Sequence, residues 1–441
     1  MKKWKKQVVA ALAFVSALMT SGCAMTVEQM YCLPQRSERY ENLQVVMDQA
    51  MDSLEYSAPV AGENQQIVQM ADLSGDGNSE IILFAKGGEE MPLKILIFTP
   101  YGDGYSYVTT IESTGTGFDQ VEYVQMDGKP GLELIVGRQV SEQVLGNVSV
   151  YSYNEGQPKQ LLNTNYIKFL TCDLDADGLY DLFVIHPGME DGDRAVASLY
   201  SIPAGEVERS AEAELSVPGE NLKRIITGTL QSGERAVFVA STAGEEAIIT
   251  DVFSLVGDTF VNVSFSSEAG TSVNTLRNYY VYADDIDMDG VVELPDLITL
   301  KTPADETGVA SQHMIRWYSL TNEAQQVDKL YTYHNYLEGW YLELDEESAS
   351  RTFLLRDDSG GYQFHLWEER EDRKLLFTIY RMTGEERMNV VQQDELQEVY
   401  KTDNVVYAVK LERAALEQGI TLEELTKRFH LIQTDWNTGE M

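Results

Sequence analysis

Cysteine is scarce in this chain of 441 residues, which contains only Cys23, Cys32 and Cys172. No CxxC pair occurs, so zinc sites of the cysteine type and thioredoxin-like redox motifs are excluded. Outside the cytoplasm Cys32 and Cys172 are able to form one disulfide, but a single bond is no disulfide framework. The fold must therefore be held together by packing.

Basic residues are also few. The chain has 33 Lys+Arg against 71 Asp+Glu, which gives a formal net charge of -38. A nucleic-acid-binding protein needs a basic surface to neutralise phosphates, and a chain this acidic does not supply one, so we exclude nucleic acid as a partner. Hydrophobic residues make up 43% of the chain, which is enough for buried cores, so we expect globular domains.

Motifs of common enzyme classes are missing as well. The sequence has no GxSxG nucleophile elbow, no GxxxxGK[ST] phosphate loop, no HExxH zinc pair and no Rossmann fingerprint. The five histidines are scattered singly. We therefore predict that the protein is not an enzyme. Carboxylates are so numerous that a pair able to hydrolyse a glycoside has no identifiable position, which leaves a polysaccharide-acting enzyme as the alternative.

Long hydrophobic runs are absent apart from residues 8–18, and these 11 residues are too few to span a bilayer. Four lysines precede this run, which is the pattern of an export signal. The signal ends in Leu18-Met19-Thr20-Ser21-Gly22-Cys23, which resembles the lipobox of bacterial lipoproteins, although Thr20 stands where Leu is usual. We predict a signal peptide over residues 1–23 and lipidation of Cys23. The protein is then anchored to the outer face of the bacterial cytoplasmic membrane. The alternative is a secreted protein cut near the same place.

Residues 24–65 are predicted to form a tether followed by an amphipathic helix. Within residues 36–54, apolar side chains recur every three or four residues, which is the helical period. They are Leu43, Val46, Met47, Ala50, Met51 and Leu54. This helix precedes the main fold.

Internal repetition dominates residues 66–334. Five segments share an apolar strand, a Gly-containing turn and a second apolar strand, and each is followed by two more strand-like runs. The segments are residues 68–85, 121–137, 166–185, 222–240 and 276–300. Four short strands per unit of about 50 residues indicate a mainly β fold, a β-propeller of about five four-stranded blades. A divergent terminal segment would add a sixth blade.

The turns of three segments resemble the loop of FG-GAP or VCBS repeats, Asp-x-Asx-x-Asp-Gly-x-x-Asp/Glu. The matching residues are Asp72, Ser74, Asp76, Asn78 and Glu80 in the first, Asp173, Asp175, Asp177, Leu179 and Asp181 in the third, and Asp285, Asp287, Asp289, Val291 and Glu293 in the fifth. The resemblance covers about three-fifths of the chain. It implies a bacterial surface protein with a propeller that binds or displays. The second turn is shortened and the fourth lacks the aligned acids, so we expect both to be metal-free.

Calcium is the expected ligand of the three acidic loops. Ca²⁺ takes six to eight oxygen ligands, and carboxylates at positions 1, 3, 5 and 9 with a backbone carbonyl at position 7 surround one ion. Ser74 gives the first loop one charge fewer, so we expect weaker binding there. Two alternatives remain open. The loops are metal-free turns held by side chain to backbone bonds, or residues 285–301 form half of an EF-hand or dockerin.

Residues 335–441 lack the acidic turn and are predicted to form a separate α+β domain. An aromatic cluster marks the junction, and within it we single out Trp317, Trp340 and Tyr341 as residues able to contact a ligand. Tyr and Trp form interface hot spots and stack on sugar rings. Packing of the seam between the propeller and its neighbour is the other role expected for these side chains.

These observations predict a lipid-anchored cell-envelope protein. Its calcium-stabilised β-propeller is expected to act as a binding or scaffolding module for an unidentified protein or glycan. The alternative is an envelope-bound hydrolase or lyase that acts on a polysaccharide. A third role is that of a structural partner in an export or cell-wall complex.

Overall fold

The computed structural model describes residues 38–140, 146–154, 156–190, 192–244, 247–300, 312–367, 373–385, 387–393 and 396–432. The predicted signal peptide, which includes Cys23, lies outside these ranges. Cys32, in the predicted tether, also lies outside them. Cys172 is buried, and burial raises the pKa of its thiol. None of the helices in the described ranges is long and apolar enough to cross a membrane.

The prediction of a mainly β chain is confirmed: the described residues form six antiparallel sheets with few helices. The first sheet contains β1 (Glu55–Tyr56), β2 (Val68–Ala71), β3 (Glu80–Lys86), β4 (Leu93–Tyr101) and β5 (Gly104–Ser113). The second contains β6 (Gly117–Val124), β7 (Glu133–Gln139), β8 (Gly146–Asn154) and β9 (Gln157–Tyr166). The third contains β10 (Lys168–Cys172), β11 (Asp181–His186), β12 (Val196–Ser201) and β13 (Glu208–Glu214).

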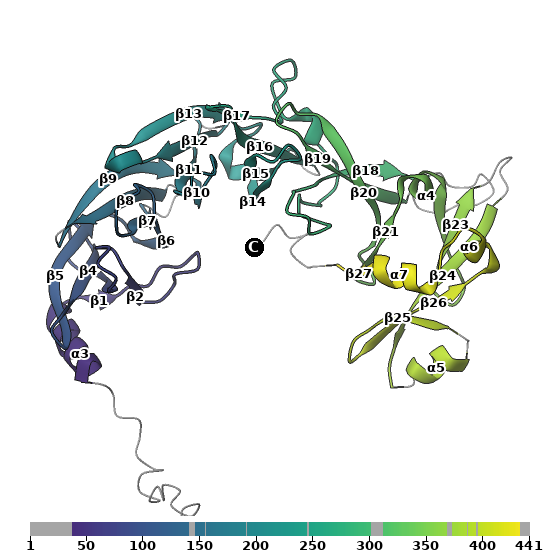
Figure 1. The fold of residues 1–441 in the computed structure, drawn as a ribbon, viewed down its shortest axis with the longest axis horizontal. Helices are drawn as coiled ribbons and strands as arrows, with labels where there is room; N and C mark the ends of the chain where they lie inside the picture. The colour runs from purple at the N-terminus through teal and green to yellow at the C-terminus, as the bar shows by residue number, and fades with distance from the viewer. Residues whose placement is uncertain are drawn as a thin grey trace, which may run out of the picture.

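The fourth sheet contains β14 (Leu222–Thr229), β15 (Arg235–Thr242), β16 (Ile248–Val256) and β17 (Thr259–Asn262). The fifth contains β18 (Leu294–Thr299), β19 (His313–Leu320), β20 (Gln326–Asn335), β21 (Trp340–Leu344) and β27 (Phe429–Leu431). The sixth contains β22 (Thr352–Arg356), β23 (Tyr362–Trp367), β24 (Arg373–Thr383), β25 (Gln397–Lys401) and β26 (Val405–Leu411). The six sheets lie one after another along an open arc (Figure 1).

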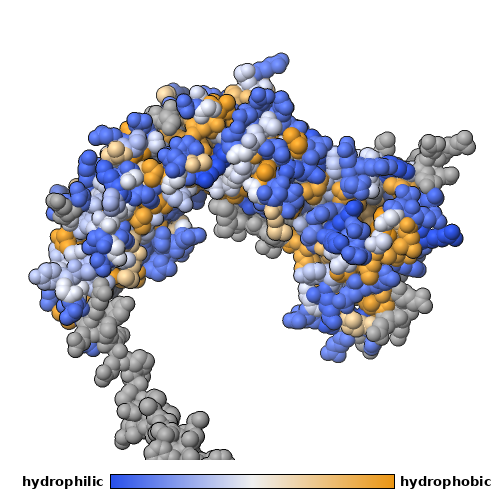
Figure 2. All heavy atoms as spheres, in the orientation of Figure 1, coloured by the Kyte–Doolittle hydropathy of each residue, from blue (hydrophilic) through white to orange (hydrophobic). Residues whose placement is uncertain are grey.

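Each sheet packs against the next through a shared core. One hydrophobic cluster joins the first and second sheets, another the second and third, and the series continues to the fifth and sixth. Strands β3, β7, β11 and β15 are therefore buried on both faces. This explains why their sequences are continuous apolar runs rather than alternating ones. Hydrophilic residues cover most of the arc on the face shown in Figure 2.

The predicted N-terminal helix is present as α3 (Glu38–Ala50). Leu43 and Met47 are buried in a core with residues of β3 and β4, and Val46 and Ala50 pack against that core. The helix covers β5 at the outer end of the first sheet (Figure 1). The helix thereby covers the edge strand at the N-terminal end of the arc.

The fifth sheet continues across the expected domain boundary at residues 334 and 335. β20 ends at Asn335, and it pairs with β21, which in turn pairs with β27 from the end of the described chain. The helices of this C-terminal part are α4 (Glu346–Arg351), α5 (Arg387–Gln393), α6 (Arg413–Glu417) and α7 (Leu422–Arg428). Thr421 caps α7, and its side chain accepts a hydrogen bond from Glu424 N.

Candidate metal centre

A loop joins β2 to β3 in the first sheet and the first two strands of each of the next three sheets, and an equivalent loop precedes β18 in the fifth. We number its positions so that position 9 pairs with the residue that precedes position 1. The loops are residues 72–80 (loop 1), 125–133 (loop 2), 173–181 (loop 3), 230–235 (loop 4) and 285–293 (loop 5). All predicted metal ligands lie in loops 1, 3 and 5.

A buried acid at position 9 closes the four nine-residue loops from within. In each loop its carboxylate accepts a hydrogen bond from the backbone N–H of position 2. The distances are 2.9 Å from Leu73 to Glu80, 2.8 Å from Met126 to Glu133, 3.4 Å from Leu174 to Asp181 and 3.1 Å from Ile286 to Glu293. The apolar position-2 side chains are buried. This apolar residue therefore holds the loop in the core while the other carboxylates stay at its mouth.

The loop pattern places glycine at position 6, where the chain turns sharply. Gly77, Gly178 and Gly290 have φ of 85, 90 and 87 degrees, the left-handed region that only glycine adopts without cost. Their N–H groups donate to the position-1 aspartates at 2.9, 3.1 and 2.9 Å. At position 7 the N–H groups of Asn78, Leu179 and Val291 donate to the position-5 aspartates. The three acidic loops thus share one backbone conformation.

Position 4 is also left-handed, and here two of the loops use a residue with a side chain. Met288 has φ of 59 degrees and is 85% exposed. Since a left-handed residue with a Cβ costs about 1 kcal/mol, Met288→Gly is expected to stabilise the protein by about that amount. The exposed Met189 has no left-handed backbone, so Met189→Gly serves as a control that gives no gain. Urea unfolding of both variants checks the prediction, and equal effects would contradict it.

The aspartates of loops 3 and 5 converge. Asp173, Asp175 and Asp177 each place an oxygen atom within 4.8 Å of the other two, and Asp285, Asp287 and Asp289 do the same. These two triplets could hold a metal ion. Partial burial and the neighbouring carboxylates raise the pKa of Asp175 and of Asp287. Each of these two loops therefore carries more negative charge than its own residues neutralise.

The position-9 acids also carry negative charge that a cation would neutralise. Loop 5 shows this most clearly. Glu293 is fully buried, and its Oε1 has no hydrogen-bond donor among the described residues. Burial raises the pKa of Glu293 to about 8, and burial raises the pKa of Asp181 in loop 3 to about 7. An unpaired buried carboxylate oxygen costs free energy unless a donor or a metal satisfies it. An oxygen-preferring divalent cation fits this place.

Loop 1 fits a metal ion less well than loops 3 and 5. Glu80 is fully buried, but it accepts hydrogen bonds from Leu73 N, Ser74 N and Thr99 Oγ1 at 2.9, 3.2 and 3.3 Å. Both of its oxygens are thus satisfied by the protein. With Ser74 at position 3, only Asp72 and Asp76 remain as carboxylates at the mouth.

Loop 2 is not shortened, contrary to our expectation. It has nine residues, with Gln125 at position 1 and Lys129 at position 5. Gln125 Oε1 accepts hydrogen bonds from Asp127 N and Gly128 N at 3.1 and 3.0 Å, which copies the role of the position-1 aspartate. Lys129 Nζ lies 3.1 Å from Asp127. The loop therefore carries its own cation.

Basic side chains also approach loops 3 and 5 from outside. Arg235, which begins β15 after the short loop 4, lies 2.5 Å from the Asp173 carboxylate and donates to the Asp173 carbonyl at 2.7 Å. Lys329 of β20 lies 2.7 Å from Asp289. Although burial opposes it, the hydrogen bond with Asp289 raises the pKa of Lys329. One positive charge for each loop offsets only part of the carboxylate charge.

The loops connect neighbouring sheets. Leu132 N of loop 2 donates to Asp72 O of loop 1 at 3.0 Å, and Tyr180 N of loop 3 donates to Gln125 O of loop 2 at 2.8 Å. At the next junction the Arg235 side chain replaces the backbone donor. A cation that fixes the position-1 residue of loop 3 will therefore also fix its contact with the fourth sheet.

The aromatic residues singled out at the junction belong to the core. Trp317 and Trp340 are 0% exposed and Tyr341 is 6% exposed. Trp317 Nε1 donates to Thr332 Oγ1 at 2.7 Å, and Trp340 stacks on Phe429. These side chains pack the seam, the second of the two roles expected for them, and offer no face to a ligand. The sequence of these strands does not show how deeply each aromatic side chain is buried.

One surface feature beside loop 3 was not expected from the sequence. A cavity of about 450 Å³ lies between the third and fourth sheets and is lined in part by Asp173, Tyr180 and Arg235. Its residues come from two repeats, and no spacing within one repeat indicates it. It brings an acid, a phenol and a guanidinium to one open surface.

No known protein family and no curated protein matches the chain. Among solved structures, the chain is similar to the exotype rhamnogalacturonan lyase YesX, with 13% sequence identity and a TM-score of 0.25. The match covers 74% of this chain and 69% of the lyase chain. A likeness this weak assigns the chain neither a family nor an activity.

Proposed function

We propose that the protein is a lipid-anchored protein of the bacterial cell envelope and that its sheets form a calcium-stabilised array of the FG-GAP/VCBS propeller type. The array acts as a binding or scaffolding module for a protein or glycan partner. The export signal, the lipobox-like segment ending in Cys23 and the repeated acidic loops support this function.

The observation that carries the proposal is the fifth loop. Three converging aspartates lie at its mouth, and the buried Glu293 has an oxygen without a donor at its base. All of these ligands are oxygen atoms, which favours a hard cation, and the loop spacing suits the six to eight ligands of calcium better than the strict octahedron of magnesium. Loop 3 repeats the arrangement with Asp181 at its base.

The anchor and the charge of the array are consistent with display away from the membrane. The anionic membrane surface repels a strongly acidic body, which loses the four lysines of the signal peptide on cleavage, so the lipid holds the chain while the sheets stay clear of the headgroups. Rigid loops at successive sheet junctions then offer a row of contact sites. Calcium would keep this row in place by fixing the loops that join neighbouring sheets.

Lipidation is tested by metabolic labelling with a palmitate analogue. The full-length chain is expected to incorporate the label and to sediment with membranes, whereas Cys23→Ala should lose the label and most of the membrane fraction. Cys32→Ala is the matched control and should keep both. Labelling of the Cys23→Ala protein would contradict the lipid anchor and leave the chain as a secreted protein.

The binding role is tested by retention of the delipidated protein on purified cell-wall glycans and envelope proteins, with calcium and with chelator. We expect retention that depends on calcium and is lost when Asp287 and Asp289 are both changed to Asn. The control is Asp103→Asn, which changes an exposed acid outside the loops. Absence of retention on every surface would contradict the module.

The cavity beside loop 3 favours one second candidate, an envelope-bound hydrolase or lyase that acts on a polysaccharide. Asp173, Tyr180 and Arg235 line it together. Incubation with acidic polysaccharides, followed by assays for reducing ends and for unsaturated products, tests this candidate. An activity that Tyr180→Phe leaves unchanged would place the chemistry elsewhere.

A further inference from the structure

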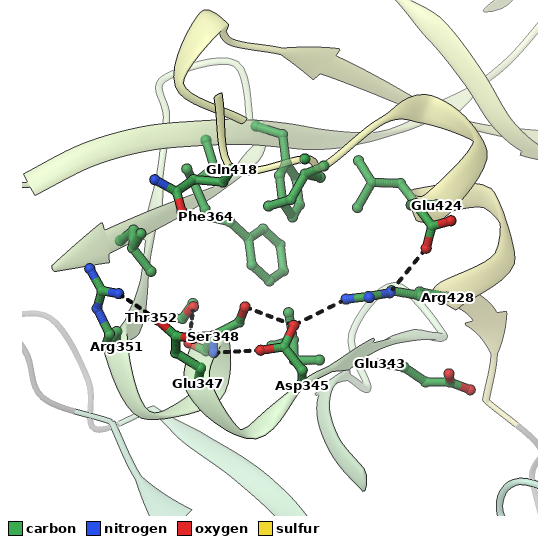
Figure 3. Close-up of a pocket in the computed structure, with 17 residues that line it drawn as sticks. Glu343, Asp345, Glu347, Ser348, Arg351, Thr352, Phe364, Gln418, Glu424 and Arg428 are labelled. Atoms are coloured by element: carbon green, nitrogen blue, oxygen red, sulfur yellow. Dashed lines mark hydrogen bonds and ion pairs between the residues drawn. The ribbon is translucent and has the colours of Figure 1, made fainter. Parts of the chain in front are cut away.

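A second cavity, of about 280 Å³, lies in the C-terminal part of the chain, far along the arc from loop 3 (Figure 3). Its walls come from β21, α4, the sheet strands β23 and β24, and the turn between α6 and α7 together with α7 itself. The residues that meet there are separated by up to 85 positions in the sequence. No metal-loop residue belongs to the lining.

The floor of this cavity is apolar. Leu344 and Ile420 form the apolar surface that faces the cavity, over the rings of Phe364 and Phe377, which lie 4.6 Å apart and are 1% and 2% exposed. These side chains also belong to the core that joins the fifth and sixth sheets, so their positions are fixed by packing. By liquid volume the cavity corresponds to about nine water molecules. A ligand with roughly ten non-hydrogen atoms fits this space.

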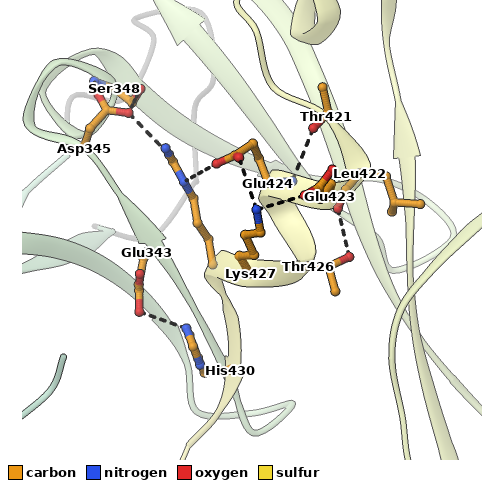
Figure 4. Close-up of polar contacts among 11 residues, drawn as sticks. Glu343, Asp345, Ser348, Thr421, Leu422, Glu423, Glu424, Thr426, Lys427 and His430 are labelled. Carbon is orange, nitrogen blue, oxygen red and sulfur yellow. Dashed lines mark hydrogen bonds and ion pairs between the residues drawn. The ribbon is translucent and has the colours of Figure 1, made fainter. Parts of the chain in front are cut away.

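The rim is polar and mostly acidic. The carboxylates of Asp345, Glu347 and Glu424 pair with two arginines, Arg351 and Arg428, whereas Glu343 pairs with His430 at 2.8 Å (Figure 4). Although partial burial opposes it, hydrogen bonds from Ser348 and Arg428 lower the pKa of Asp345. The rim therefore carries a surplus of two negative charges at neutral pH.

The arginines of the rim are already engaged. Arg428 lies 3.4 Å from Asp345 and 3.8 Å from Glu424, which ties the end of α7 to the start of α4 (Figure 3). Arg351 pairs with Glu347 at 3.0 Å and donates to the carbonyl of Trp367 at 3.0 Å. Both positive charges of the rim are therefore paired with its own carboxylates, and the remaining charge of the rim is negative.

We propose that this cavity binds a small organic cation whose ammonium group lies among the rim carboxylates and whose apolar ring or chain packs on Leu344 and Ile420. A positive charge that carries N–H donors matches the acidic rim. The ligand is either a free amine or the amino terminus of a peptide that begins with an apolar residue. The site does not depend on the metal loops and goes beyond the function proposed above.

Three phenyl-substituted probes of similar size and different charge test the proposal with the intact soluble protein. They are phenethylammonium, 2-phenylethanol and 3-phenylpropionate, titrated while chemical shifts or heats are measured, with calcium present throughout. We expect the cation to bind at least threefold more tightly than the neutral alcohol, and the anion to bind least. Equal binding of cation and anion, or no saturation by the cation at millimolar concentration, would overturn the proposal.

Variants locate the binding. Glu347→Gln and Glu424→Gln should each weaken binding of the cation by about threefold. This is the size of effect expected for exposed ion pairs. Glu423→Gln is the matched control, because Glu423 lies on the same helix and pairs with Lys427 outside the cavity. Glu347→Lys should shift the preference toward the anion. An unchanged preference in that variant, with unfolding showing a native fold, would place the probe elsewhere.

A last comparison identifies the source of the cation. Phenylalanine amide and the tripeptide Phe-Gly-Gly both present a free amino group beside an aromatic side chain. Tighter binding of the tripeptide indicates a peptide amino terminus, and tighter binding of phenethylammonium indicates a free amine. Loss of binding on acetylation of the amino group is expected for either source, and its persistence would overturn the role of the cation.

Discussion

Chelation of divalent cations from the soluble chain is expected to lower the midpoint of thermal unfolding by roughly 5 to 10 °C. A site that binds only the folded state contributes about 2.7 kcal/mol when the free cation is a hundredfold above its Kd. Loops 3 and 5 together therefore supply about twice that amount. Differential scanning calorimetry with calcium and with chelator measures the effect, and isothermal titration should give two ions per chain.

The calcium effect should depend on pH because the position-9 acids change their pKa on folding. Their folded pKa is raised, to about 7 for Asp181 and about 8 for Glu293. The stability that these acids contribute is fully present below the unfolded pKa and is lost as pH rises through the folded pKa. Through these acids the metal-free protein is less stable at pH 8 than at pH 5.5. Calcium should therefore stabilise it more at pH 8.

Paired variants separate the two sites. Changing Asp287 and Asp289 together to Asn should remove one ion and about half of the stabilisation, and changing Asp175 and Asp177 together should remove the other. Asp103→Asn should change neither quantity. A calcium response that survives in both double variants would contradict the loops as the binding sites. A response of zero in the unaltered chain would leave them as ordinary acidic turns.

The acidic loops could be predicted because their pattern is local. Gly290 at position 6 and the acids around it lie within nine residues, and the turn fixes their geometry whatever surrounds them. Loop 2 differs from the expected shortened turn because its aspartate, Asp127, stands at position 3 rather than at position 1. The spacing back from Glu133 would have placed Gln125 there and Lys129 at position 5.

Features that join distant parts of the chain were not predictable from one sequence. The C-terminal cavity depends on the contact between Asp345 and Arg428, which are 83 residues apart. Strand β27 belongs to the fifth sheet although all strands of the sixth sheet lie between it and β21 in the sequence. Burial of Trp317 and Trp340 likewise depends on the packing of the fifth sheet against its neighbours. Strand periodicity identifies the sheets but not the order of their packing along the arc.

Acid is expected to destabilise the protein through a single buried histidine in this aromatic seam. His334 is 9% exposed and stacks on Tyr341, with Trp317 and Tyr336 nearby. Burial lowers the pKa of His334 to about 3, and no carboxylate of the described chain contributes to the shift. Unfolding therefore exposes a group that takes up a proton at any pH below about 6.5.

The sign of the effect follows from linkage. A depressed folded pKa means that the unfolded state binds the extra proton, so stability is present above pH 6.5 and is lost as pH falls toward 3. At pH 5 the loss from His334 alone is about 2 kcal/mol. Asp181 and Glu293 act in the opposite direction over part of this range, because their raised pKa favours the folded state on acidification.

Comparison with a variant isolates the contribution of the histidine. His334→Phe keeps an aromatic ring in the seam and cannot be protonated, so its urea midpoint should fall less than that of the unaltered chain between pH 7.5 and pH 5. His313→Gln is the control, since His313 is a half-buried residue at the start of β19 whose side chain lies beside Thr299 rather than in the seam. Parallel pH profiles for His334→Phe and the unaltered chain would show that protonation of this seam does not drive acid unfolding. A profile for His334→Phe that is flatter by about 2 kcal/mol is the expected result, because the shift arises from burial alone.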